Sequence, residues 1–98
     1  MQNKISALLG FSRKSGALKL GTEATRESVL RRRAKLVLLA NDISPKSVKE
    51  IRFICDKNNI KAEILPMTIE EISAAIGRRA GILALEDEGF ASAILKNI

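Results

Sequence analysis

The sequence predicts an α/β protein: a three-layer α/β/α sandwich around a mixed sheet of about four strands. Short apolar runs of strand length alternate with segments whose apolar residues recur every three or four positions, as in helices with one buried face. The runs at residues 35–40 and 82–85 are almost unbroken, which is typical of strands covered on both faces. Because 98 residues is the size of one domain, residues 1–98 are expected to form a single unit.

The first helix is predicted over residues 3–12, where apolar residues have the i, i+3, i+4 spacing of one buried face. Residues 13–16 then form a short basic turn. Residues 17–20 follow as a short strand, from which Lys19 points outward. Gly21 allows the chain to turn sharply into the next element.

A second helix is expected over about residues 23–33, with Thr22 as its N-cap. Glu23 in its first turn suits the positive end of the helix dipole, and the arginines at residues 31–33 suit the negative end. The apolar run at residues 35–40 follows as a buried strand.

The third helix is predicted to begin at Ser44 and Pro45, because a serine N-cap followed by proline is a common helix start. Cys55 falls on its apolar stripe. The asparagines at residues 58–59 suit a left-handed helix end. A strand of three or four residues is expected at residues 62–65.

The fourth helix has the clearest local signature, because Thr68 and Glu71 form a capping box. Gly77 is expected to end this helix, and the buried strand at residues 82–85 follows. Asp87 can cap a last helix. The apolar positions assigned to that helix are Phe90, Ile94 and Ile98.

The chain has a formal net charge of +6, from 17 basic and 11 acidic residues. Residues 1–35 hold nine Lys or Arg and two Glu, whereas residues 36–98 hold eight basic and nine acidic residues. All the excess charge therefore lies in the first third. A localised basic region is typical of a protein that binds a polyanion, although a solvated basic face has the same composition.

Residues suited to catalysis are scarce. The chain has no histidine, which is the most common general base and metal ligand. Cys55 is expected to be a small buried hydrophobe rather than a nucleophile. The acidic clusters at residues 70–71 and 86–88 stand at helix starts, where capping explains them, with a carboxylate metal site at 86–88 as the alternative. We therefore expect no enzymatic activity, no cofactor and no small-molecule substrate.

The sequence also bears on location. A single cysteine makes no intrachain disulfide, and no apolar run approaches the roughly 18 residues of a membrane helix. The first residues lack the pattern of a signal peptide. A cytoplasmic protein without membrane contact is expected.

The polyanion most consistent with these residues is structured RNA. A helix N-terminus flanked by arginines is a suitable phosphate site, and arginine also stacks on bases and pairs with them bidentately. Single-strand binders stack bases on aromatic side chains, but this chain has only three phenylalanines, and two or more of them are expected in the core. Backbone contacts to a folded RNA fit better. DNA binding has no helix-turn-helix or zinc-finger pattern to support it.

Several segments together resemble a known family: residues 8–16 (LLGFSRKSG), 21–22 (GT), 34–40 (AKLVLLA), 42–45 (DISP) and 76–78 (IGR). The chain is similar to the kink-turn-binding ribosomal proteins of archaeal and eukaryotic large subunits, and in particular to their small bacterial relatives of the YlxQ type. The resemblance covers nearly the whole chain. It implies an α/β/α sandwich that works within a ribonucleoprotein.

The resemblance also implies a ligand, the RNA kink-turn, which is a sharply bent internal loop flanked by tandem sheared G·A pairs. In the family, a Gly-Thr-Asn-Glu-x-x-Lys segment contacts those pairs, and a small apolar loop before the last strand makes a second contact. Residues 21–27 here read Gly-Thr-Glu-Ala-Thr-Arg-Glu, and the loop at residues 77–81 is more basic. The family's asparagine, glutamate and lysine fall on Glu23, Ala24 and Glu27.

The sequence thus predicts a non-catalytic protein that binds structured RNA, kink-turn-like or another ribosomal or non-coding RNA. Its partners would be that RNA and other ribonucleoprotein proteins. The alternative is a protein-interaction scaffold of a ribosome- or transcription-associated assembly that has lost RNA recognition. The predicted RNA-binding residues are Arg13, Lys14, Lys19, Gly21, Thr22, Glu23, Arg26, Arg78 and Arg79.

Overall fold

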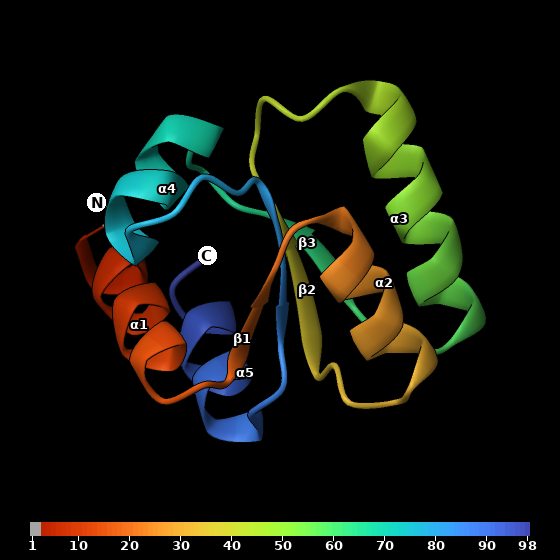
Figure 1. The fold of residues 1–98 in the computed structure, drawn as a ribbon, viewed down its shortest axis with the longest axis horizontal. Helices are drawn as coiled ribbons and strands as arrows, with labels where there is room; N and C mark the ends of the chain where they lie inside the picture. Colours follow the sequence, from red (N-terminus) through yellow and green to blue (C-terminus); the bar gives the residue numbers. More distant parts are fainter. Residues whose placement is uncertain (1–2) are drawn as a thin grey trace.

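A four-stranded mixed sheet lies between two layers of helices in the computed structural model, which describes residues 3–98 (Figure 1). The strand order is β1-β4-β2-β3. β2 and β3 are parallel, whereas β4 runs antiparallel to both β1 and β2. The three-layer sandwich and the mixed sheet predicted from the sequence are therefore confirmed. The strands are β1 (Leu18–Leu20), β2 (Leu36–Leu39), β3 (Ala62–Ile64) and β4 (Ile82–Leu85).

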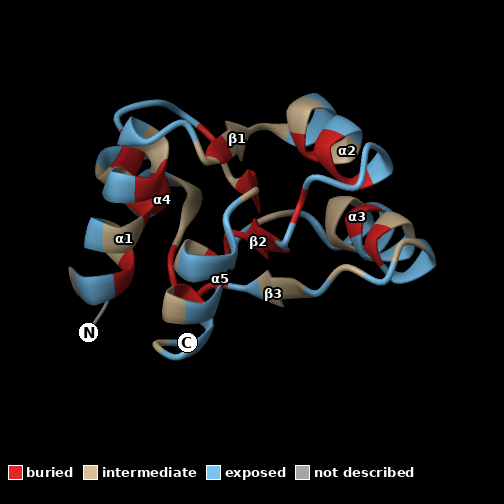
Figure 2. Cartoon of the chain, turned by 90° about the horizontal axis from the view of Figure 1, so that it is seen from below, coloured by how far each residue is buried: buried red, intermediate tan, exposed pale blue. Residues whose placement is uncertain are grey.

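Five helices cover the sheet, with α2 and α3 on one face and α1, α4 and α5 on the other (Figures 1 and 2). Their buried parts face the sheet. No helix among residues 3–98 is long and apolar enough to cross a membrane. The helices are α1 (Asn3–Lys14), α2 (Thr22–Leu30), α3 (Pro45–Lys57), α4 (Ile69–Ile76) and α5 (Glu88–Leu95).

The two central strands are buried on both faces, as their apolar runs predicted. Every residue of β2 is fully buried. Leu36 and Leu38 belong to the core beneath α1, α4 and α5, whereas Val37 and Leu39 belong to the core beneath α2 and α3. Successive side chains of a strand point to opposite faces, so an unbroken apolar run is what a sheet between two helical layers requires.

The helix starts predicted for the second half of the chain are confirmed. The Ser44 hydroxyl accepts the Ser47 N–H at 3.2 Å, and the Asp87 carboxylate accepts the Phe90 N–H at 2.9 Å. Thr68 and Glu71 form the reciprocal capping box. Such caps depend on residues within a single turn, which is why the sequence shows them.

Three boundaries of the first two helices differ from expectation. α1 continues through Lys14, so Arg13 and Lys14 lie in its last turn and not in a loop. The N-cap of α2 is Gly21 rather than Thr22, and no side chain caps that helix. α2 also ends at Leu30, because Arg32 adopts a left-handed φ of 61° that stops the helix.

The last helix is shorter than its apolar pattern suggested. α5 ends at Leu95, and Ile98 lies beyond it with 47% of its surface exposed. Phe90 is half-buried and Ile94 fully buried, as expected for the inner face. The assignment of Ile98 to that face was wrong because the helix ends before reaching it.

Candidate nucleic-acid interface

The carboxyl end of the sheet brings together segments that are far apart in the sequence. β1, β2 and β3 all end there, and the antiparallel β4 begins there. α2, α3 and α4, which follow the first three strands, consequently start at this end. Ligands of open α/β sheets commonly bind outside the carboxyl ends of strands, in contact with helix starts.

Gly21 connects the start of α2 to the start of β4. Its backbone N–H donates to the carbonyl oxygen of Ile82 at 2.8 Å. Its φ of 94° and ψ of 169° fall in a region that only glycine adopts readily. A side chain at this position would therefore strain the turn that points the first residues of α2 outward.

The first turn of α2 has free hydrogen-bond donors. The N–H groups of Thr22, Glu23 and Ala24 have no acceptor within residues 3–98, since the first intrahelical bond runs from the Thr25 N–H to the Gly21 carbonyl at 3.0 Å. Thr22 and Glu23 are exposed. Uncapped amides at a helix start carry a partial positive charge and favour an anion.

The loop from Gly77 to Gly81, which we call the arginine loop, carries two arginines on a backbone that is held in place. Arg78 and Arg79 are both exposed and have no ion pair within the described residues. Ala80 is buried, and its N–H donates to the Ser73 hydroxyl at 3.1 Å. A Cβ at Gly81 would lie 2.7 Å from the Ile69 side chain, so the backbone passes too close for any other residue without a shift.

Arg13 and Lys14 lie on the flank formed by α1 and α4. The Arg13 guanidinium donates to the carbonyl oxygen of Ile76, the last residue of α4. Lys14 is exposed, and both side chains line a hollow that also includes Gly77. The structure thus places them beside the residue at which the arginine loop begins, with part of the Arg13 guanidinium already engaged.

Lys19 lies away from the start of α2, whereas Arg26 stays beside Glu23 near that start. Lys19, in the middle of β1, lines a small cavity together with Glu27 and Glu86. The Arg26 guanidinium lies 3.5 Å from the Glu23 carboxylate, on the outside of α2. Both cations consequently have acidic neighbours, unlike Arg78 and Arg79.

The basic first third of the sequence does not form one patch. Residues 31–33 follow the C-terminal end of α2, whereas Gly21 stands at its start. A helix of nine residues separates these ends by about 13 Å, from its rise of 1.5 Å per residue. The Arg31 guanidinium is also paired with the Glu27 carboxylate at 3.1 Å.

The expectation that most phenylalanines are in the core is wrong. Phe11 is 59% exposed and Phe53 is 61% exposed. Their positions within the helices predict this exposure, which the amino-acid composition does not show. Phe11 follows the buried Leu9 by two positions, and Phe53 follows the buried Ile51 by two, a rotation of about 200° onto the opposite side of the helix.

Residues 3–98 contain no group of three or more His, Cys, Asp or Glu side chains positioned to hold a metal ion. Burial raises the pKa of the Cys55 thiol to about 11, and the neighbouring Asp56 carboxylate adds to the effect. A thiol with this pKa is protonated at neutral pH and is a poor nucleophile. Cys55 is a core residue of the α2–α3 face, as the sequence predicted.

Comparison with known proteins identifies a matching family and solved structures with the same fold. The sequence model of the ribosomal protein L7Ae/L30e/S12e/Gadd45 family matches residues 3–95. A solved structure of a protein with unknown function from Bacillus halodurans C superposes with a TM-score of 0.89 at 22% identity, covering 95% of this chain and 94% of that one. The Giardia lamblia 15.5kD RNA binding protein superposes with a TM-score of 0.79 at 15% identity, covering 97% and 82%.

Proposed function

The chain belongs to the ribosomal protein L7Ae/L30e/S12e/Gadd45 family, and on this premise we propose that it binds structured RNA at the carboxyl end of its sheet. The observation that carries the proposal is the hydrogen bond from the Gly21 N–H to the Ile82 carbonyl. This bond holds the uncapped start of α2 beside β4, the strand that follows the arginine loop. The free amides of α2 and the unpaired guanidinium groups of Arg78 and Arg79 can therefore bind the same ligand.

The proposed binding is led by phosphate. Backbone amides at a helix start and arginine side chains both donate to phosphate oxygens, and such contacts supply much of the affinity of proteins for nucleic acids. Arg78 and Arg79 are well suited because neither has to break an ion pair on binding RNA. The Giardia relative is named as an RNA-binding protein, which is consistent with this role.

We further propose that the RNA is of the kink-turn type and that Glu23 reads it. The Glu23 side chain is 87% exposed and lies next to the free amides of α2. A carboxylate accepts hydrogen bonds from the N1–H and N2–H groups of a guanine whose edge is exposed, as in a sheared G·A pair. The nearby Arg26 guanidinium offsets the repulsion between this carboxylate and phosphates.

The proposed role is non-catalytic. RNA recognition of this kind requires donors and shape, and the fold supplies both. The described residues offer no cluster of metal ligands, and the thiol of Cys55 is buried and protonated.

Fluorescence anisotropy with three labelled RNAs tests the proposal. The RNAs are a kink-turn, the same molecule with its G·A pairs replaced by Watson–Crick pairs, and a plain duplex of equal length. Each is titrated at two salt concentrations. We expect the intact kink-turn to bind at least about tenfold more tightly than either control, which corresponds to about 1.4 kcal/mol.

The remaining outcomes separate the general proposal from its finer part. Equal and steeply salt-dependent binding of all three RNAs would retain phosphate-led binding and reject kink-turn recognition. No binding to any of the three at low salt would reject RNA binding at this surface and favour the scaffold alternative.

A further inference from the structure

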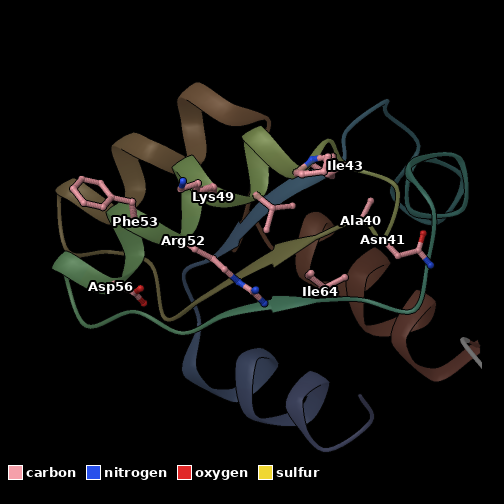
Figure 3. A pocket seen from close by; sticks show the side chains of 10 residues that line it. Ala40, Asn41, Ile43, Lys49, Arg52, Phe53, Asp56 and Ile64 are labelled. Carbon is pink, nitrogen blue, oxygen red and sulfur yellow. The ribbon is translucent and has the colours of Figure 1, made fainter.

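A hollow of about 610 Å³ opens between α3 and the outer edge of the sheet, which is formed by β3 (Figure 3). We name it the α3–β3 groove. Its lining is mostly apolar, Lys49 and Arg52 supply two positive charges, and Asp56 supplies one carboxylate. The residues that matter for its use are Pro45, Val48, Lys49, Arg52, Phe53 and Ile64.

Two large apolar side chains are exposed at this groove. Phe53 is 61% exposed and Ile64 is 38% exposed. They come from separate elements, α3 and β3, and line one continuous hollow. An exposed apolar surface that is concave and edged by charges is typical of an interaction site, because covering it removes apolar area from water.

The same groove runs beside an open strand edge. β3 is the last strand of the sheet and pairs only with β2 among the described residues. The bonds from the Val37 N–H to Lys61 and from the Leu65 N–H to Leu39 show that alternate residues of this segment bond toward β2. In a parallel ladder the residues between them, Ala62 and Ile64, present their N–H and C=O groups outward. These groups are a template for one more strand.

Arg52 is positioned to bind a carboxylate there. Figure 3 shows its side chain extending from α3 across the groove toward β3. Asp56 is four residues away on the same helix, yet Arg52 has no ion pair within residues 3–98. An unpaired guanidinium with all its donors free is well matched to an Asp or Glu side chain, with which it pairs bidentately.

We propose that the α3–β3 groove binds an extended segment of a partner protein, which adds as a fifth strand to the outer edge of β3. Side chains on one face of that segment enter the groove, an apolar residue against Val48 and Ile64 and an Asp or Glu against Arg52. Main-chain hydrogen bonds to Ala62 and Ile64 hold the segment in register. Lys61 before β3 and Pro66 after it limit the pairing to a short stretch.

The surface favours a peptide over RNA for two reasons. Apart from Phe53, the apolar lining is aliphatic, whereas single-stranded RNA needs aromatic faces on which bases stack. The Phe53 ring is already engaged, since the Lys57 ammonium lies 5.0 Å from its centroid. The proposed partner thus binds at the β3 edge, while the start of α2 follows β1 at the opposite edge and stays free for RNA.

The test is an NMR titration of the ¹⁵N-labelled full chain with the peptide acetyl-Ile-Ser-Asp-Ser-Ile-amide. In a strand, its isoleucines and aspartate share one face. We expect shifts confined to β3 and to the groove side of α3. Arg52→Ala should weaken binding at least about fivefold, or about 1 kcal/mol. The matched control, Arg33→Ala, replaces another exposed arginine outside the groove and should bind as the wild type does.

Peptide variants distinguish strand addition from simple contact. One version is N-methylated at both serines, and the other at the isoleucines and the aspartate. Only one of these two sets of N–H groups can face β3, so one version should lose binding and the other retain it. Replacing the peptide aspartate with asparagine should weaken binding to the wild type but not to Arg52→Ala.

Three results would overturn the proposal. The first is the absence of shifts at β3 with peptide up to about 5 mM, beyond the weak range of specific contacts. The second is equal loss of binding, or none, with the two N-methylated versions. The third is shifting of the same residues by a single-stranded oligouridylate but not by the peptide, which would assign the groove to RNA.

Discussion

The guanidinium of Arg13, in the last turn of α1, donates a hydrogen bond to the carbonyl oxygen of Ile76 at the end of α4. Carbonyls in the last turn of a helix lack intrahelical partners, and a cation there also interacts favourably with the helix dipole. Gly77, which has a left-handed φ of 78°, leaves the carbonyl accessible, and a Cβ on it would lie 3.3 Å from the Arg13 Nη1. A residue predicted to bind RNA therefore also joins two helices.

Arg13→Ala is expected to lower the free energy of unfolding by about 1–2 kcal/mol, because the Ile76 carbonyl loses a charged donor. Urea unfolding followed by circular dichroism measures the change. Lys14→Ala removes an equal charge from an exposed neighbour without a described hydrogen bond and should stay within about 0.5 kcal/mol of the wild type. Similar destabilisation in both variants would contradict the structural role of Arg13.

Gly21→Ala should destabilise the protein by about 1–3 kcal/mol, since alanine does not readily adopt its backbone angles. The same change should weaken RNA binding, because the start of α2 and Ile82 would no longer be held together. Thr22→Ala is the control for stability. The Thr22 hydroxyl makes no cap hydrogen bond, so its loss should leave the unfolding midpoint unchanged.

The double variant Arg78→Ala/Arg79→Ala should bind RNA more weakly at low salt while unfolding at the wild-type urea concentration, because both side chains are exposed. The slope of log affinity against log salt should fall by about one for each phosphate that the variant no longer neutralises. A control of equal charge, Lys57→Ala/Lys61→Ala, changes the end of α3 and the residue before β3. An unchanged slope in the arginine variant, or an equal fall in both, would remove the loop from the interface.

Ser73→Ala tests whether RNA binding requires the backbone of the arginine loop to be held in place. The Ser73 hydroxyl accepts the Ala80 N–H at 3.1 Å and donates to the Ile69 carbonyl at 2.7 Å. Its loss leaves a buried N–H unsatisfied, at a cost of about 1–3 kcal/mol. We expect faster amide exchange at Ala80 by NMR and weaker RNA binding with no change in charge. Ser92→Ala, on the exposed side of α5, should show neither effect.

The raised pKa of Cys55 makes stability depend on alkaline pH. The thiol ionises near pH 9 when unfolded and near pH 11 when folded, so its contribution is fully present below pH 9 and is lost as the pH rises toward 11. The loss should reach about 2–3 kcal/mol. Urea unfolding at pH 8 and pH 11 should therefore show a smaller difference in Cys55→Ala than in the wild type. An equal difference in the two proteins would mean that Cys55 does not contribute to it.

The residues predicted to bind RNA do not all lie together in the structure. Gly21, Thr22 and Glu23 do stand at the start of α2, and the loop with Arg78 and Arg79 does lead into β4. Lys19 lies beside Glu27 and Glu86 instead, and Arg26 is paired with Glu23, because a strand and a helix fix the direction of each side chain, which a count of charges ignores. Ser73 and Ile82 were missed, since a serine within a helix and a backbone carbonyl carry no signal in the sequence.

The helices, the strands and most of their ends follow from local patterns in the sequence. Thr68 and Glu71 cap α4, and the apolar run of β2 is buried, because each feature depends on residues within a turn or on one strand. The strand order and the antiparallel direction of β4 instead depend on how the whole chain packs. Contacts such as Gly21 with Ile82 arise only once distant segments pack against the same sheet, and packing depends on the whole core rather than on any local pattern.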